Sequence, residues 1–551
     1  MCCTLAPLSA QYVPPLDGPL LVTGTFGELR SDHYHGGIDF RAPIGTPVRA
    51  VADGYVSRVL VSGGGFGQAV YVDHPGGKRS VYGHLEVLAP ELLDTIRSLQ
   101  YAGETFAVNF LPDSTAFPVR QGQVIGGVGN RGYSFGPHLH FEWREQDTDA
   151  QLNPLVLGFP VPDTRRPNLR KLRVYSWGLD GHPTASQTFD LERAALPDTV
   201  RVTEPRLAFG FQAFDRQNGM PNRNGVYQAR LQVDTATAFA VTFDRVPIED
   251  TEYINALTDY REYQDTKAWY YLLYAATPRA VYWQDTLRAG GQLMLLPGGA
   301  VPVTVTVADY AGNVSEVKTV VKYEPPPVAG TAPAVTYQYY LPAGEPSIID
   351  TAGMRLELDA DALYDDLNFR YARLADGSDG YLSDTHQLQD GRTPLHGRAT
   401  LYLRPRAPVA DSLRPRVYIG RCGGDGQQQP VGGEWQPDGS MQARIGGFGN
   451  YALLLDTVPP EVAIRDFRTD LRNRGAFSLL ITDVAGNGGL SYRATVDGKW
   501  VLMEYDAKSN TLTHRFDDTR VRIGGDRQHE FVLHVTDARG NESTFRRNFR
   551  R

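Results

Sequence analysis

The sequence has little cysteine. The three thiols of the 551-residue chain are Cys2, Cys3 and Cys422. Two adjacent cysteines and one distant cysteine cannot form the disulfide framework of a small secreted domain or a cysteine-rich metal site. Any bound metal must therefore be held by histidine and carboxylate side chains.

Long apolar runs and an excess of positive charge are also absent. No segment approaches the ~18 consecutive apolar residues of a membrane helix, so no membrane span is predicted. The 55 Lys and Arg are outnumbered by 63 Asp and Glu, which gives a net charge of −8 with intermixed signs. This composition argues against a nucleic-acid partner and leaves the oligomeric state open.

The N-terminal stretch MCCTLAPLSAQ ends in small residues, as a signal-peptide cleavage region does, but has no charged start and no full apolar segment. We interpret segment 1–19 as containing a truncated export signal, with a frayed terminus as the alternative. The first interpretation predicts an exported protein, located in the periplasm, at the cell envelope or outside the cell.

The sequence is rich in turn and β-forming residues, with 57 Gly, 37 Pro and 29 Tyr. Its length exceeds the about 250–300 residues at which a single hydrophobic core stops growing. We therefore predict a mainly β chain of several domains. The predicted units are the segment 1–19, an antiparallel-sheet domain over 20–162, a β-sandwich over 163–324, a proline-rich linker at 325–333, a β-sandwich over 334–457 and an Ig-like β-sandwich over 458–551.

One segment of the first domain has helical periodicity. APELLDTIRSLQYAG places Leu92, Leu93, Ile96 and Leu99 at helical spacing, with Pro90 at a suitable first helical position. This predicts a helical insert between two strands. A long insert in a small domain often forms an active-site wall or a docking surface.

The phrases VADYAGN, ITDVAGN and VTDARGN recur at Asp309, Asp483 and Asp537, each beside β-branched residues. Their Gly-Asn pairs favour tight connections between sandwich strands. A calcium site is the alternative, and it is disfavoured because the phrases alone supply too few oxygen ligands.

Histidines concentrate in the first domain. Six of the 12 histidines lie between His33 and His140. In PHLHF, His138 and His140 are two residues apart in a predicted strand, so both side chains project from one face. In HYHGGIDF the double glycine favours a loop entering a strand, which lets His35 and Asp39 converge.

Two histidines and one carboxylate form a familiar set of ligands for catalytic zinc. Three protein ligands leave a fourth position open for water. Such a metal lowers the pKa of water towards ~7 and polarises a carbonyl group, which is what amide hydrolysis needs.

Three motifs occur together in this domain: H-x-x-x-D at His35, Y-x-H-L at Tyr82 and G-x-S-x-G-P-H-L-H-F-E from Gly132. With them, residues of about 20–160 resemble the lysostaphin/LytM-type zinc endopeptidases of peptidase family M23. The resemblance implies one Zn²⁺ per active site on His35, Asp39 and His140, with His84 and His138 as catalytic histidines. Glu142, on the same strand face as His140, is suited to orient that ligand from behind.

The resemblance also implies a zinc metallopeptidase that hydrolyses amide bonds by attack of zinc-activated water. Its implied substrate is peptidoglycan, cut in stem peptides or cross-bridges. Two alternatives stay open. One is a non-catalytic LytM-type protein that regulates cell-wall hydrolases, and the other is a surface adhesion or assembly protein with an accessory peptidase domain.

Overall fold

The computed structural model describes residues 12–177, 183–275, 284–286, 289–325, 337–375, 380–423 and 427–551. The stretch on which the export-signal interpretation rests and most of the predicted linker at 325–333 lie outside these ranges. Within them the chain is mainly β, which confirms the predicted fold class. No helix among the described residues is long and apolar enough to cross a bilayer.

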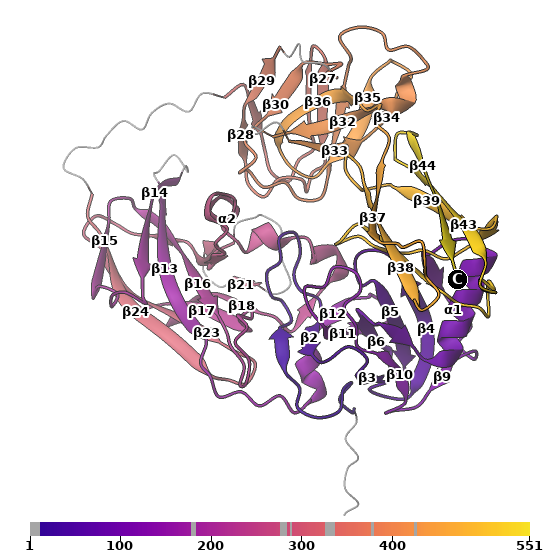
Figure 1. The fold of residues 1–551 in the computed structure, drawn as a ribbon. Helices are drawn as coiled ribbons and strands as arrows, with labels where there is room; N and C mark the ends of the chain where they lie inside the picture. Colours follow the sequence, from indigo (N-terminus) through magenta and orange to yellow (C-terminus); the bar gives the residue numbers. More distant parts are fainter. Residues whose placement is uncertain are drawn as a thin grey trace, which may run out of the picture.

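The first domain is built on one antiparallel sheet (Figure 1). Its strands lie in the spatial order β1 (Val22–Gly24), β2 (Ile38–Arg41), β11 (His138–Glu145), β6 (Lys78–Gly83), β5 (Gln68–His74), β4 (Gly54–Val61) and β8 (Val108–Phe110). A smaller sheet consists of β3 (Pro47–Arg49), β10 (Val124–Gly127) and β7 (Val87–Leu88). One face of the large sheet and the small sheet together form a core that includes Phe40, Val59 and Phe141.

The predicted helical insert is α1 (Pro90–Ala102), which follows β7. Proline begins the helix at a position where its missing N–H costs no hydrogen bond, and Gly103 ends it. Leu92 and Ile96 are buried against the sheet domain, whereas Leu99 is exposed. The apolar periodicity therefore predicted the helix correctly, but it predicted only part of the buried face.

Three further β-sheet units follow the first domain. The unit after residue 163 pairs β14 (Pro183–Asp190), β13 (Asn168–Trp177), β16 (Arg206–Phe214) and β20 (Tyr271–Leu272) in one sheet, and β15 (Thr199–Val202), β24 (Val314–Tyr323), β23 (Ala300–Ala308), β17 (Gln228–Val233), β18 (Ala236–Thr242) and β21 (Gln284–Thr286) in the other. We call this unit the second module. Phe209, Leu231 and Val305 lie in its core.

The third module contains two five-stranded sheets and a two-stranded sheet of β25 (Tyr339–Leu341) and β28 (Leu367–Phe369). The strand order of one five-stranded sheet is β26 (Ser347–Thr351), β27 (Met354–Leu358), β31 (Ala399–Leu403), β35 (Met441–Ile445) and β34 (Glu434–Trp435). The order of the other is β29 (Tyr371–Leu374), β30 (Thr385–Leu388), β36 (Gly449–Leu455), β32 (Val417–Cys422) and β33 (Gln428–Gly432). The fourth module stacks β37 (Glu461–Asp466), β38 (Ala476–Thr482), β42 (Thr511–Arg515) and β41 (Glu504–Asp506) against β40 (Lys499–Trp500), β39 (Ser491–Val496), β43 (Gln528–Thr536) and β44 (Glu542–Arg550).

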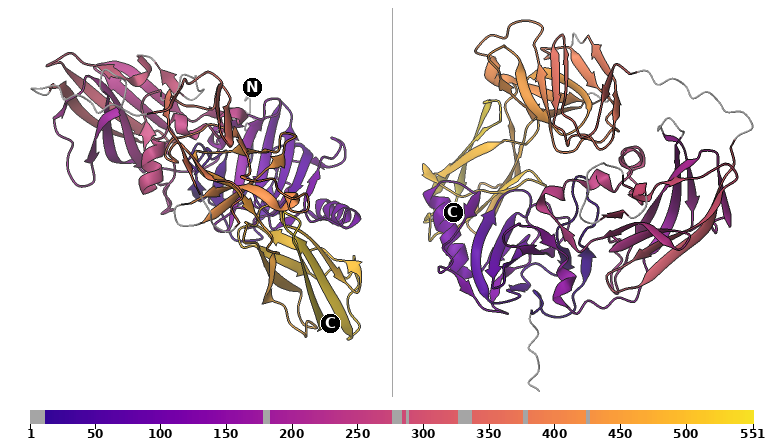
Figure 2. Two further views of the ribbon diagram at one scale, coloured as in Figure 1. Left: turned by 90° about the horizontal axis from the view of Figure 1, so that it is seen from above. Right: turned by 180° about the vertical axis from the view of Figure 1, so that it is seen from behind.

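The chain curves so that its last module returns to the first domain (Figures 1 and 2). The fourth module lies beside α1, where Trp500 meets Tyr101 edge to face with ring centroids 5.0 Å apart. On the other side of the first domain, β12 (Gln151–Leu152) pairs with β19 (Arg245–Val246) of the second module. The first domain is therefore held between two sandwich modules that are distant from each other in sequence.

Candidate metal centre and catalytic residues

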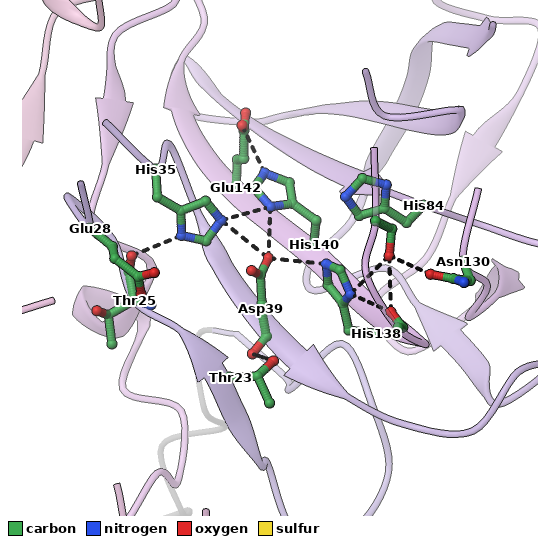
Figure 3. Close-up of polar contacts among 12 residues, drawn as sticks. Thr23, Thr25, Glu28, His35, Asp39, His84, Asn130, His138, His140 and Glu142 are labelled. Carbon is green, nitrogen blue, oxygen red and sulfur yellow. Dashed lines mark hydrogen bonds and ion pairs between the residues drawn. The ribbon is translucent and has the colours of Figure 1, made fainter. Parts of the chain in front are cut away.

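Three neighbouring strands bring the predicted site residues together. In the register of the sheet, His140 on β11 lies opposite Asp39 on β2 on one side and opposite Gly83, the last residue of β6, on the other. His84 follows Gly83 directly, and His35 lies on the loop that enters β2. Figure 3 shows the side chains converging on one point.

His35, Asp39 and His140, which we call the histidine cluster, lie close enough to hold one metal ion. Asp39 Oδ1 is 3.2 Å from His35 Nε2 and 2.9 Å from His140 Nδ1, and the two nitrogens are 3.0 Å apart. All three residues are buried. The distances place three donor atoms around one small volume.

The outer hydrogen bonds of the two rings fix which nitrogen carries the proton. His35 Nδ1 donates to the carbonyl oxygen of Thr25 at 2.8 Å, and His140 Nε2 faces Glu142 Oε1 at 3.0 Å (Figure 3). In the neutral rings the inner nitrogens therefore present lone pairs to Asp39. Three electron-pair donors then face one another with no proton between them, and a cation resolves this arrangement. The donor set of two imidazoles and one carboxylate fits zinc.

The electrostatics of the cluster also favour a positive charge. Burial disfavours protonated His140, but its hydrogen bonds to Asp39 and Glu142 outweigh burial and raise its pKa to about 9. Glu142 is itself kept ionised, since Arg144 and His140 overcome its burial and lower its pKa to about 2. Proton and metal ion therefore compete for the same point.

His138 and His84 stand beside the cluster with their rings 4.8 Å apart. His138 Nδ1 donates to the carbonyl oxygen of Gly136 at 2.8 Å, and His84 Nδ1 donates to that of Arg131 at 2.8 Å. Each ring therefore keeps Nε2 for chemistry, and His138 Nε2 lies 3.5 Å from Asp39 Oδ1. Burial, reinforced by the neighbouring histidines, lowers the pKa of His84 to about 3, so this ring is neutral near pH 7.

The backbone at His84 is in the left-handed region, with a φ of 61°. A side chain there carries a conformational cost of order 1–3 kcal/mol, which persists only where surrounding contacts enforce it. The ring hydrogen bond to the Arg131 carbonyl is one such contact. The strained position turns the imidazole towards His138 instead of leaving it along β6.

Other residues at the site were not assigned from the sequence. Ser134 donates to Asn130 Oδ1 at 2.7 Å and lies 3.2 Å from His138 Nδ1, so it supports the ring of His138. Ser134 and Asn130 belong to the phrase GNRGYSFGPHLHFE, so polar residues close to the motif histidines could have indicated them. The Thr25 carbonyl had no signal, because a backbone acceptor can come from any residue type. Arg30 lies 3.4 Å from Asp39 Oδ2.

Comparison with known proteins adds to this geometry. The model of peptidase family M23 matches residues 33–106, and that of the Zu5-like domain matches residues 338–456 in the third module. The DD-carboxypeptidase/endopeptidase Mpg of Neisseria meningitidis is 37% identical over 135 residues, which cover 24% of this chain and 25% of Mpg. The peptidoglycan DD-endopeptidase ShyC of Vibrio cholerae is 30% identical over 138 residues, covering 25% of this chain and 26% of ShyC.

Among solved structures, the catalytic domain of the prophage-encoded M23 protein EnpA from Enterococcus faecalis is 29% identical, with a TM-score of 0.20. The match covers 26% of this chain and 93% of that domain. The chain thus spans about a quarter of the length of the curated relatives Mpg and ShyC. The family match and the identities to Mpg and ShyC confirm the resemblance: the chain contains a domain of peptidase family M23.

Proposed function

We propose that the chain is a zinc metalloendopeptidase that hydrolyses amide bonds in the peptide cross-links of bacterial peptidoglycan. The observation that carries this proposal is the histidine cluster, in which three lone-pair donors face one another beside two further imidazoles. The name of Mpg supports endopeptidase activity, and that of ShyC, a peptidoglycan DD-endopeptidase, supports the substrate class. No member of the motif set is missing, which favours an enzyme over a non-catalytic regulator.

The residues of this chain divide the chemistry between them. Bound zinc would polarise the scissile carbonyl and acidify the attacking water. His84 and His138 would move protons, because each has its Nδ1 anchored on a carbonyl oxygen and its Nε2 available. Neutral His84 is suited to accept a proton, and a protonated ring at either position could stabilise the developing oxyanion or donate to the leaving amine.

The proposed substrate lies outside the cytoplasmic membrane. We therefore also propose that the protein is exported and acts in the periplasm or at the cell envelope. Stem peptides or cross-bridges of peptidoglycan are its proposed partners. Protease protection of the tagged protein in intact and permeabilised cells tests this location.

Metal analysis combined with peptidoglycan digestion tests the proposed activity. The wild type should contain one zinc per chain and release muropeptides and free amines, whereas His140→Ala should lose both zinc and activity. Stoichiometric zinc in His140→Ala would contradict the ligand assignment. A zinc-loaded wild type that releases no products from peptidoglycan would contradict the substrate.

A further inference from the structure

Two more groups of three carboxylates lie where the chain passes from one unit into the next. The first linker cluster consists of Asp163, Asp215 and Asp309, and the second of Asp456, Asp483 and Asp537; within each cluster one oxygen per residue lies within 4.8 Å of the others. The recurring D-x-x-G-N phrases supplied only one or two of these residues, so the sequence did not show the clusters.

The first linker cluster is assembled from three separate segments. Asp163 lies in the linker before β13, Asp215 directly follows β16, and Asp309 directly follows β23. Asn313, at the end of the Asp309 loop, connects this loop to the linker. Its Nδ2 donates to Asp309 Oδ2 at 2.8 Å and to the Asp163 carbonyl oxygen at 3.2 Å. The loop aspartate and the linker aspartate are therefore held in a fixed relation.

The second linker cluster repeats this construction with different segments. Asp456 lies in the linker before β37, Asp483 follows β38 and Asp537 follows β43. Asn541 Nδ2 donates to Asp537 Oδ2 at 2.8 Å and to the Asp456 carbonyl at 3.3 Å. The same arrangement thus occurs at two module junctions.

The serine two residues after each asparagine extends the correspondence. Ser315 donates to the carbonyl of Pro167, and Ser543 donates to the carbonyl of Pro460. Each proline immediately precedes the first strand of its module. The two junctions therefore share the loop sequence and also the hydrogen bonds between the loop and the linker.

Neither cluster is neutralised by a salt bridge within the part of the chain that the structure describes. Among the described residues, no salt bridge joins any of these six aspartates to Lys or Arg, whereas Asp73, for example, lies 2.6 Å from Arg79. Three crowded carboxylates without a counter-ion are costly to keep ionised.

Two buried oxygens in and beside the first linker cluster lack hydrogen-bond partners. Asp215 is 2% exposed and its Oδ1 has no partner, and Gln217 is 6% exposed with Oε1 likewise unpartnered. Both residues line a cavity of about 230 Å³ together with Asp163 and Asp309. An amide oxygen without a donor, in a cavity that three carboxylates also line, is expected of a cation ligand, because buried acceptors are otherwise satisfied.

The second linker cluster has the same feature. Asp456 is 6% exposed and its Oδ2 has no partner, and Asp483 Oδ1 is also buried without one. In each cluster the aspartate that binds the loop asparagine is already partnered. Asp309 Oδ1 accepts from the backbone N–H of Asn313 at 2.9 Å. Asp537 Oδ1 accepts from that of Asn541 at 2.9 Å. The free oxygens therefore belong to the strand-end and linker residues, where an ion would join the two.

We propose that each linker cluster binds one calcium ion, which fastens the linker to the loops of the module that follows it. The donors are all oxygen, which selects a hard cation over zinc. Calcium accepts six to eight oxygens in irregular geometry, whereas magnesium demands a near-ideal octahedron. Three carboxylates, the Gln217 amide and water suit the former. This proposal is independent of the peptidase activity.

Calcium titration of the full-length protein tests the proposal. Protein freed of metal on a chelating resin and reloaded with one equivalent of zinc should bind two calcium ions per chain by isothermal titration calorimetry. Asp215→Asn and Asp483→Asn should each leave one binding event, and the double variant none. Asp361→Asn, at an exposed carboxylate, is the matched control and should keep both.

Absence of saturable calcium binding in the wild type would overturn the proposal, as would unchanged stoichiometry in both single variants. Preference for magnesium over calcium would overturn the choice of ion. Melting temperatures give a second readout. In chelator Asp215→Asn should melt above the wild type, because it relieves repulsion; in calcium it should melt below it. A variant that is less stable than the wild type by the same amount in both conditions would assign Asp215 a purely structural role and refute calcium binding there.

Discussion

The histidine cluster and the first linker cluster are both groups of three side chains with donor atoms within 4.8 Å of one another, yet they are suited to different ions. In the histidine cluster, Thr25 and Glu142 hold the outer ring protons, so nitrogen lone pairs point inward. In the first linker cluster every donor is an oxygen. The comparison shows that the contacts behind the ligands, as well as the ligands, determine which metal a site can bind.

Removal of the metal ions should have the largest effect and should distinguish the two kinds of site. Chelation should abolish peptidoglycan hydrolysis and also lower the melting temperature. Zinc should then restore hydrolysis, and calcium should restore the melting temperature, since each site selects its ion by donor type. Activity assays and thermal melts of one stripped sample, with either metal added back alone, measure both. Full recovery of activity with calcium alone would contradict the comparison.

Substitution of His84 should reduce catalysis without removing zinc. His84 lies outside the three-residue cluster, and loss of a proton-transfer group typically costs about 10²–10⁴-fold in rate. We expect His84→Ala to keep one zinc per chain and to lose kcat by that order. Zinc content by mass spectrometry and product release measure the two effects. A fall in zinc content as large as that of His140→Ala would make His84 a ligand.

Substitution of Glu142 should have an intermediate effect. Its carboxylate accepts from His140 Nε2 at 3.0 Å and fixes the ring that presents Nδ1. Loss of such a contact behind a ligand typically costs about 10–100-fold in metal affinity. Glu142→Gln should therefore weaken zinc binding by that factor in competition with a chelator. Glu145→Gln, at the half-buried last residue of β11 and paired with Arg245, is the control and should leave zinc affinity unchanged.

Much of the site could be predicted because its signals are local. His138 and His140 alternate along one strand, and His35 and Asp39 lie on one short loop and strand. The three motifs also match a known family over about 20–160. These signals do not depend on knowing which strands pair. The mainly β fold followed in the same way from composition and periodicity.

The remaining features depend on long-range contacts. Nothing near Asp163 or Asp456 in the sequence indicates that these linker residues meet a loop aspartate. The D-x-x-G-N phrases indicated only the loops, and these alone supply too few oxygen ligands for a calcium ion. Likewise, the insert after His84 could be predicted as a helix, but its partner is a module some 400 residues away, as the pair Arg97 and Glu504 shows.

The contact that the fourth module makes with the first domain gives the smallest of the expected effects. Unlike the metal ligands, its residue Glu504 acts on the site only through another residue. Glu504 of the fourth module, 9% exposed at its side chain, pairs with Arg97 and with Arg131, whose carbonyl holds His84. Although burial opposes ionisation, Arg131 and Arg97 lower the pKa of Glu504 to about 2.

Glu504→Gln should lower kcat by about tenfold at most and leave zinc content and KM unchanged, because it loosens a positioning contact and removes no reacting group. The folded-state pKa of Glu504 is below its unfolded value, so the ionised carboxylate stabilises the protein at neutral pH. The melting-temperature difference between wild type and variant should therefore be full near pH 7 and shrink as the pH falls towards 2. Glu104→Gln removes a half-exposed pair with Arg493 at the same interface and should change little. Equal losses of kcat in both variants would mean that docking of the module as a whole, and not the contact from Glu504 through Arg131 to His84, supports the site.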